Sequence, residues 1–135
     1  ISSGRHNPWN QAYGGFGTWT HEGGSSMNYY YGTAGSNNVP YSNVGSGSTP
    51  TNTWYGMCTT RNTSTITWYQ NTNVQNSTTN AYGALANTTA NIQIGLGYTG
   101  VYWAGSISMI LAYTRALSSD EVAQNYNAYR GRYGI

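Results

Sequence analysis

Charge is what this sequence lacks most. It has five basic residues, all of them arginine, and three acidic residues, so its formal net charge is only +2. Proteins that bind nucleic acids gather several basic side chains against the phosphates. Here Arg130 and Arg132 are the only basic residues close together in the sequence. We therefore expect no nucleic-acid partner.

Two other absences narrow the class of protein further. No run of apolar residues is long enough to span a bilayer, so we expect no association with a membrane. Cys58 is the only cysteine, which excludes a disulfide within the chain. Cys58 falls in a strand-like pattern, where a buried and inert thiol is expected.

Acidic residues are also too few for the usual hydrolytic and metal sites. Glycosidases place two carboxylates across the scissile bond, whereas Asp120 and Glu121 are adjacent at the start of a predicted helix and Glu22 stands alone. No acid is placed to orient His6 or His21, as a serine hydrolase triad requires. Calcium prefers several carboxylate oxygens. We expect no enzymatic activity from this chain, no catalytic residue, no metal site and no cofactor.

The chain is rich instead in aromatic and small polar residues. It has 14 Tyr, 5 Trp and 18 Gly. So much aromatic surface is not left solvated, which argues against a disordered chain. Solubility must come from Asn, Ser, Thr and Tyr hydroxyl groups rather than from charge. Such a surface suits a protein held in a large assembly, or one that meets glycans.

One short helix is predicted near the C-terminus, over about residues 118–130. Ser118 and Glu121 have the spacing of a capping box, in which each side chain accepts from the backbone N–H of the other residue. Asp120 and Glu121 stand at the positive end of the helix dipole. Gly131 is predicted to end the helix.

The rest of the chain is predicted to form short strands separated by turns, from its alternating apolar residues and its Gly, Asn and Ser clusters. This pattern predicts an all-β fold: one antiparallel β-sandwich domain over residues 1–135, with one short C-terminal helix. Residues 36–52 are predicted to form a loop, and residues 71–90 a loop or an edge strand. The predicted strands are 16–21 and 27–31, with a turn at 22–25; 53–60 and 64–70, connected by 61–63; 91–96; and 107–113.

Alternate aromatic side chains fill the core of a sandwich, and we expect Trp54, Trp68 and Tyr113 there. Neighbours on a strand face opposite ways, so Tyr29-Tyr30-Tyr31 and Tyr102-Trp103 must each turn at least one ring outward. Outward rings can stack on sugars or enter a protein interface. The interface is favoured, because Tyr and Trp dominate such contacts. The candidate carbohydrate-binding residues are Trp9, Trp19, Tyr30, Tyr102 and Trp103.

The order of motifs in the second half of the chain resembles a known family. Trp54 opens a strand, a hairpin strand returns, Ile94-Gly95 follows, and then come residues 102–107 and 113–118 with Glu121. This order is similar to the C-terminal half of concanavalin A-like lectin/glucanase domains, which are LamG-like jelly rolls. The closing stretch Tyr126-Asn-Ala-Tyr-Arg-Gly-Arg-Tyr-Gly134 resembles the version that ends many tailed-phage virion proteins. The likeness covers about residues 53–134 well and residues 1–35 loosely.

The sequence departs from that family in two places. Members usually have an Asn-Gly turn where this chain has Gln70-Asn71-Thr72-Asn73, so this turn must differ. A full domain of the family is also longer, and we expect this chain to lack its N-terminal strands. A sandwich without them would leave one sheet face bare, which is costly for so aromatic a sheet.

The resemblance implies a non-enzymatic structural or decoration protein, such as a capsid decoration or tail-fibre component, at the virion surface and thus extracellular. Its partners would be other virion protein chains, in a homo-oligomer, and glycans bound weakly. A secreted carbohydrate-binding module of a larger extracellular protein is the alternative, and half of a glycoside hydrolase is a third interpretation. This fold carries lectins, hydrolases and structural modules, so the family alone does not decide among them.

Overall fold

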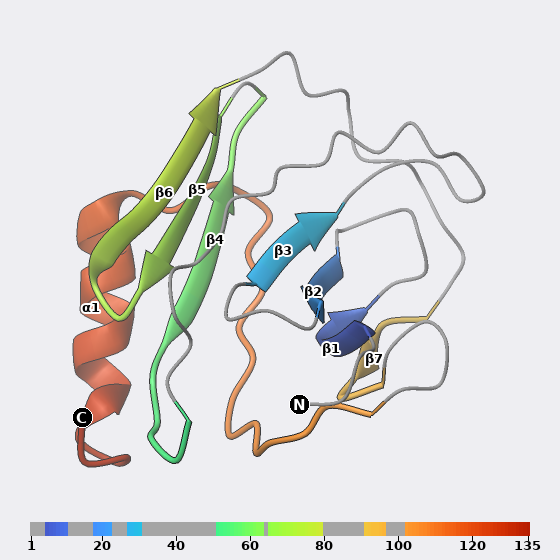
Figure 1. Cartoon of the computed structure of the whole chain (residues 1–135). Coiled ribbons are helices and arrows are strands. Elements are labelled where there is room, and N and C mark those ends of the chain that lie inside the picture. Colours follow the sequence, from blue (N-terminus) through green and yellow to red (C-terminus); the bar gives the residue numbers. More distant parts are fainter. Residues whose placement is uncertain are drawn as a thin grey trace.

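The computed structural model describes residues 5–10, 18–22, 27–30, 51–63, 65–79, 91–96 and 102–135. Within them lie two antiparallel sheets and one helix (Figure 1). The strand order is β3-β2-β1-β7 in the first sheet and β4-β5-β6 in the second. The all-β prediction with one short C-terminal helix is confirmed. The bounds are β1 Arg5–Asn10, β2 Thr18–Glu22, β3 Met27–Tyr30, β4 Met57–Arg61, β5 Thr65–Gln70, β6 Asn73–Thr79, β7 Gln93–Ile94 and α1 Ser119–Arg130.

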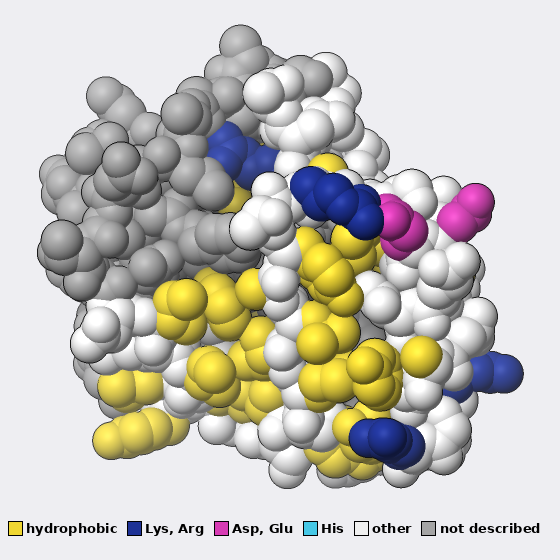
Figure 2. Space-filling model, turned by 180° about the vertical axis from the view of Figure 1, so that it is seen from behind, with side chains coloured by type: hydrophobic (Ala, Val, Ile, Leu, Met, Phe, Trp, Pro, Cys, Tyr) yellow, Lys and Arg dark blue, Asp and Glu magenta, His cyan; other side chains and the backbone are white. Residues whose placement is uncertain are grey.

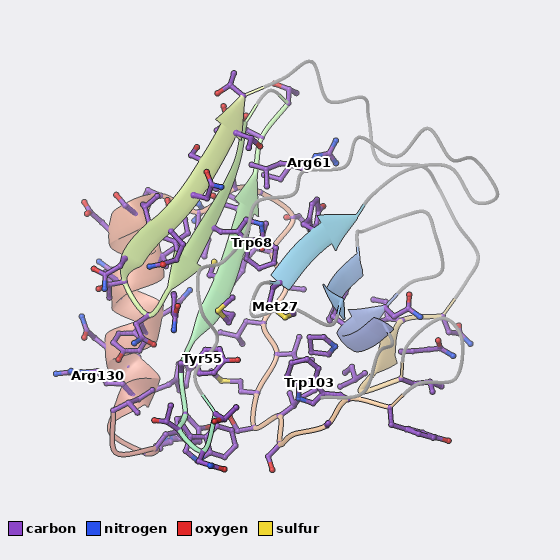
Figure 3. All side chains as sticks on the ribbon, viewed as in Figure 1. Met27, Tyr55, Arg61, Trp68, Trp103 and Arg130 are labelled. Atoms are coloured by element: carbon purple, nitrogen blue, oxygen red, sulfur yellow. The ribbon has the colours of Figure 1, made fainter. Side chains whose placement is uncertain are left out.

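The two sheets pack against each other through β3 and β5. Ile66 and Trp68 of β5 are fully buried, and they form one core cluster with Met27 and Tyr29 of β3. Figure 3 shows Trp68 and Met27 directed into the space between the sheets, with Trp103 nearby. The predicted core position of Trp68 is therefore confirmed.

The helix α1 covers the opposite side of the three-stranded sheet (Figure 1). Side chains alternate along β4, so Gly56 and Cys58 share the face that is turned away from the core cluster. The ring of Tyr126 in α1 lies directly over Gly56. Three layers result, in which the second sheet stands between the first sheet and the helix.

Strand β1 is an element that the sequence pattern does not predict, and Pro8 is the reason. Proline has no N–H for a ladder, which normally excludes it from a central strand except at a bulge. The register between β1 and β2 shifts between His6 and Trp9, at the position of Pro8. On the other edge the Pro8 carbonyl accepts a hydrogen bond from the Gly95 N–H at 3.0 Å.

The predicted hairpin over residues 53–70 is confirmed as β4 and β5. Its loop is closed by Asn62, whose N–H donates to the Thr65 carbonyl at 3.0 Å and whose Oδ1 accepts from the Thr65 N–H at 2.7 Å. Asn62 does not take a left-handed backbone conformation, since it is not among the residues with positive φ. It stabilises the loop through its side-chain oxygen, which accepts the hydrogen bond.

The next turn, between β5 and β6, differs from Asn-Gly as predicted. Asn71 takes the left-handed conformation itself, with φ 57°. Its N–H donates to the Gly56 carbonyl at 2.7 Å, and its Oδ1 accepts from the Gly56 N–H at 2.9 Å. This reciprocal pair ties the turn to the chain that enters β4. The edge strand predicted within residues 71–90 is β6.

Cys58 is placed as the sequence predicts. It lies in β4 opposite Tyr69 of β5, on the face that is turned toward α1. Burial raises the pKa of the Cys58 thiol to about 11. The thiol therefore stays protonated at neutral pH and is a poor nucleophile. The Cys58 residue is half-buried rather than fully buried, and its inertness stays a prediction.

The helix begins as predicted, at Ser118. The Ser118 Oγ accepts from the Glu121 N–H at 3.2 Å, and the Glu121 carboxylate accepts from the Ser118 N–H at 2.9 Å, which completes the capping box. The end differs in detail. Gly131 is the C-cap but keeps a right-handed conformation (φ −61°), and the left-handed glycine is Gly134 (φ 67°), after one further turn.

The strand predicted over residues 107–113 is wrong. These residues are irregular in the structure and belong to no ladder in the described part of the chain. Alternating apolar residues predict a strand only where another strand offers its edge, and no described strand does so here. Tyr113 accordingly lies exposed instead of in the core. Trp54 was also expected in the core and is exposed, because β4 begins three residues after it.

Three further predictions fall partly or wholly outside the described residues. The turn after Glu22 does so, although β2 and β3 pair as the predicted hairpin requires. Residues 36–50 of the loop predicted over 36–52, and residues 80–90 of the loop or edge strand predicted over 71–90, lie outside as well. In the part of the chain that is described, no helix combines the length and hydrophobicity needed to cross a bilayer.

The contact between Gly56 and Tyr126 gives a test of the packing of α1. A Cβ at residue 56 would lie 3.3 Å from the Tyr126 ring. We expect Gly56→Val to lower the free energy of unfolding by about 1–3 kcal/mol, because the added side chain overpacks this contact. Chemical denaturation followed by tryptophan fluorescence measures the change.

Gly131→Ala is the matched control for that variant. A Cβ at residue 131 meets nothing within 4 Å, and its backbone suits alanine. We expect its stability to be unchanged or slightly raised. Equal losses in the two variants would mean that α1 does not pack on Gly56 as described.

Candidate binding surface

Residues 103–118, which lead to α1, have no helix or strand, and residues 106–113 are here called the apolar segment (Figure 1). One end is fixed by Trp103, whose ring packs against the core cluster and whose N–H donates to the Gly95 carbonyl at 2.8 Å. The other end is fixed at the start of α1. The segment is therefore held at both ends across a span that has no ladder of its own.

The helix end of this span is held by an ion pair. The two terminal guanidinium nitrogens of Arg115 donate to the two carboxylate oxygens of Glu121, with Nη1 to Oε2 at 2.7 Å. The hydrogen bonds from Arg115 first, and then the backbone N–H of Ser118, lower the pKa of Glu121 to about 2. The same pairing raises the pKa of Arg115. One carboxylate thus caps α1 and ties the incoming chain to it.

The apolar segment presents large hydrophobic side chains to solvent. Met109, Leu111 and Tyr113 are 39, 46 and 40 % exposed, while Ile107 and Ile110 are half-buried beneath them. The Tyr113 hydroxyl accepts from Asn125 Nδ2 at 3.0 Å, which fixes that ring beside α1. No charged residue occurs in the segment.

Further exposed hydrophobic residues come from the chain just before the segment. Tyr102 is 74 % exposed, and Ile92 and Ile94 are exposed as well. An isolated bridge between Leu96 and Tyr102, together with the bond from Trp103 to Gly95, holds this strand end beside the start of the span. Tyr102 and Trp103 face opposite ways, one outward and one against the core, as the alternation predicts.

An aromatic pair lies at the C-terminal end of α1. Trp54 is 40 % exposed and packs on Tyr133, with ring centroids 5.3 Å apart and a tilt of 39°. Nearby, the Arg132 guanidinium stands 5.8 Å from the centre of the Tyr129 ring, which is a cation–π contact. Tyr133 braces the Trp54 ring, so the pair forms a fixed aromatic platform.

Figure 2 shows the side of the molecule opposite to the view of Figure 1, where hydrophobic side chains gather in a patch. A strip of white backbone and polar atoms crosses this side, at the place of the apolar segment, with hydrophobic side chains on both flanks. We call this side the apolar face. Single exposed hydrophobic residues are ordinary, but a contiguous patch marks an interaction site.

The five predicted carbohydrate-binding residues fall into three groups. Tyr102 is well exposed, and Trp103 is half-buried against the core. Trp9 is half-buried in β1, in register with Trp19 of β2 and Ile94 of β7. Trp19 and Tyr30 have their backbones in β2 and β3, and their side chains lie outside the described part of the structure. Sugar binding by all five stays a prediction.

The acidic side chains that are described have structural roles. Asp120 and Glu121 both lie in the first turn of α1, and Glu121 is engaged by Arg115 and Ser118. In the described part of the chain, no three or more His, Cys, Asp or Glu side chains gather where a metal ion could bind. What the described surface offers is therefore aromatic and aliphatic contact, with hydroxyl and amide groups around it.

Two antiparallel sheets packed face to face, with one helix on the outside, define an all-β sandwich protein. More narrowly, the chain belongs to the concanavalin A-like lectin/glucanase superfamily, whose Laminin_G_3 family model matches residues 3–123. The match extends through the first half of the chain, where the sequence showed only a loose likeness. It ends before the closing motif at residues 126–134.

Two other comparisons add nothing to this assignment. The structure is similar to an S-layer domain-containing protein (residues 221–444) from Clostridium thermocellum, with 18 % identity and a TM-score of 0.46. That likeness covers 93 % of this chain and 64 % of the other, so this chain spans less than two thirds of that solved structure. No curated protein matches the sequence.

The ion pair at the start of α1 predicts how stability depends on pH. The folded state lowers the Glu121 pKa from 4.5 to about 2, so its stabilising effect is complete above about pH 4.5 and is lost as the pH falls toward 2. We expect the melting temperature to fall over that range. In Glu121→Gln we expect a flatter pH profile, because this variant has no carboxylate to protonate. A variant profile parallel to the wild type would show that Glu121 is not the group responsible.

Proposed function

We propose that this chain is a non-enzymatic structural or decoration module at the surface of a virion, where its lectin-like sandwich makes contacts with other protein chains. The observation that carries this proposal is the apolar face, with Met109, Leu111, Tyr113 and Tyr102 exposed on or beside one span. Contiguous patches of this kind are characteristic of surfaces that another protein covers.

The low charge of the chain supports a role in a fixed assembly. Interface cores are depleted of charged residues and enriched in Tyr, Trp and Met, which is the composition around the apolar segment. Only eight residues in 135 are formally charged, five basic and three acidic, so the surface offers little repulsion between neighbouring copies. Many copies in one particle would also give useful avidity to a weak glycan contact.

The virion setting rests on the closing motif Tyr126–Gly134 and its likeness to the ends of tailed-phage proteins. A virion surface is extracellular, which agrees with a superfamily that includes lectins. The non-enzymatic role is supported by the use of Asp120 and Glu121 at the helix start. Retaining and inverting glycosidases need two carboxylates free to face the scissile bond.

The first test is the mass of the native particle that contains this chain. Intact mass spectrometry with light scattering is expected to find many copies in a large symmetric assembly, together with other chains. The physical reason is that burying the apolar face removes its hydrophobic side chains from water. A native protein that stays a free monomer would overturn the proposal.

A carbohydrate-binding module of a larger extracellular protein is the second candidate, and the Trp54–Tyr133 platform is what favours it. Indole rings stack on the apolar faces of sugars, and Tyr133 holds the Trp54 ring in one orientation. Asn52 and Thr53 are exposed just before Trp54 and offer the polar groups that a sugar rim requires.

A glycan array separates this candidate from the first. If the platform binds sugar, the chain should be retained on particular glycans, and Trp54→Ala should weaken binding at least about tenfold through loss of stacking. Val74→Ala removes an exposed hydrophobic side chain on β6 and is the matched control. Retention that does not respond to Trp54→Ala, in a variant whose melting temperature shows that it is folded, would exclude the platform.

A further inference from the structure

The apolar segment combines exposed side chains with unused backbone groups. No backbone–backbone hydrogen bond within the described part of the chain involves residues 106–113. Most of these residues are exposed. Eight consecutive residues thus offer donors and acceptors beside a row of hydrophobic side chains. This combination favours pairing with another strand.

The segment also lacks the features that keep exposed edges from pairing. Natural edges carry charges, proline or bulges that prevent association. Residues 106–113 contain no charged residue and no proline. The edge strand β6 also has no charged residue and no proline, but most of its side chains are polar, its Asn76 Oδ1 accepts from the Ser77 N–H at 2.8 Å, and its register with β5 is irregular. An unprotected edge in a folded protein indicates that something covers it.

We propose that residues 106–113 are the edge at which a second copy of this chain pairs, antiparallel and about a two-fold axis at Ile110, so that Met109 of each copy lies opposite Leu111 of the other. The segment then becomes a strand, and the two copies share one ladder. This proposal rests on the assembly role proposed above and names the surface and the partner that begin the assembly.

The distribution of charge favours a second copy in this orientation. Arg115 follows the segment closely, so parallel pairing would bring two guanidinium groups side by side. Antiparallel pairing sends them to opposite ends, and each keeps its own Glu121. The uncharged segment meets nothing in its copy that repels it, and its exposed Met109 and Leu111 meet the same kind of residue across the axis.

The area available is near what a stable dimer needs. The exposed parts of Met109, Leu111 and Tyr113, with those of Tyr102, Ile92 and Ile94, come to roughly 600 Å² for side chains of this size. A standard interface takes about 800 Å² from each partner, and the paired backbone supplies further area. A two-fold arrangement uses the same patch on both copies, which suits a single uncharged edge.

The test uses the isolated chain of residues 1–135. Light scattering over a range of concentrations is expected to find a species of twice 14.7 kDa. Amide hydrogen exchange is expected to show protection of residues 106–113 that grows with concentration. Leu111→Asp places two like charges close to the axis and should weaken the dimer at least about tenfold.

Val74→Asp is the matched control, since it adds the same charge at an exposed hydrophobic residue of β6. It should leave both the mass and the exchange pattern unchanged. Circular dichroism of each variant checks that it folds. A chain that stays monomeric, or a dimer that ignores Leu111→Asp and leaves residues 106–113 unprotected, overturns the proposed pairing. Assembly of the native particle with other chains is measured separately, so the proposed function can stand when the pairing fails.

Discussion

The structure depends on one contact between its two sheets, the packing of Trp68 in β5 against Met27 in β3. This contact fixes the register of β5, because a slip by one residue would turn Trp68 and Ile66 toward the helix side. An irregularity in the β5–β6 register falls directly after Trp68. Tyr69 is also buried, on the side of α1, because neighbouring side chains on a strand face opposite ways. Both faces of β5 are therefore buried, one against the first sheet and the other against α1.

Besides the fold class and the core position of Trp68, the features that sequence reasoning predicted correctly are local ones. The capping box needs only Ser118 and Glu121, and the hairpin loop needs only Asn62, so neighbouring residues decide both. Strand β1 was missed because Pro8 argues against a strand, and the bulge that accommodates it depends on β2. The strand predicted over 107–113 is wrong because it, too, depended on contacts with another part of the chain. Its alternation is real, but a ladder requires a partner that no sequence pattern supplies.

The candidate surface was predictable only in part. The alternation of Tyr102 and Trp103 correctly gave one ring outward and one inward. Trp54 was assigned to the core because a strand was expected to begin before it, whereas it precedes β4 and rests on Tyr133. The exposed row from Met109 to Tyr113 was missed entirely. Its signal was the absence of charge and proline over the segment, which hydrophobic periodicity does not register. Sugar binding at Trp9, Trp19 and Tyr30 stays a prediction.

The pairing of β7 with β1 in the first sheet joins distant parts of the sequence, which bears on the order of folding. Strand β7 pairs with β1 through only two residue pairs, supported by a side-chain bond from Asn10 to Gln93 across a separation of 83 residues. The β4–β5–β6 meander joins neighbours through short turns, so it loses far less chain entropy on closing. We therefore expect the meander to form early and β7 to pair late. Because the Trp103 N–H is bonded to Gly95 immediately after β7, an opening of that short ladder would also loosen the near end of the apolar segment, so the order of that surface is linked to a pairing between distant parts of the sequence.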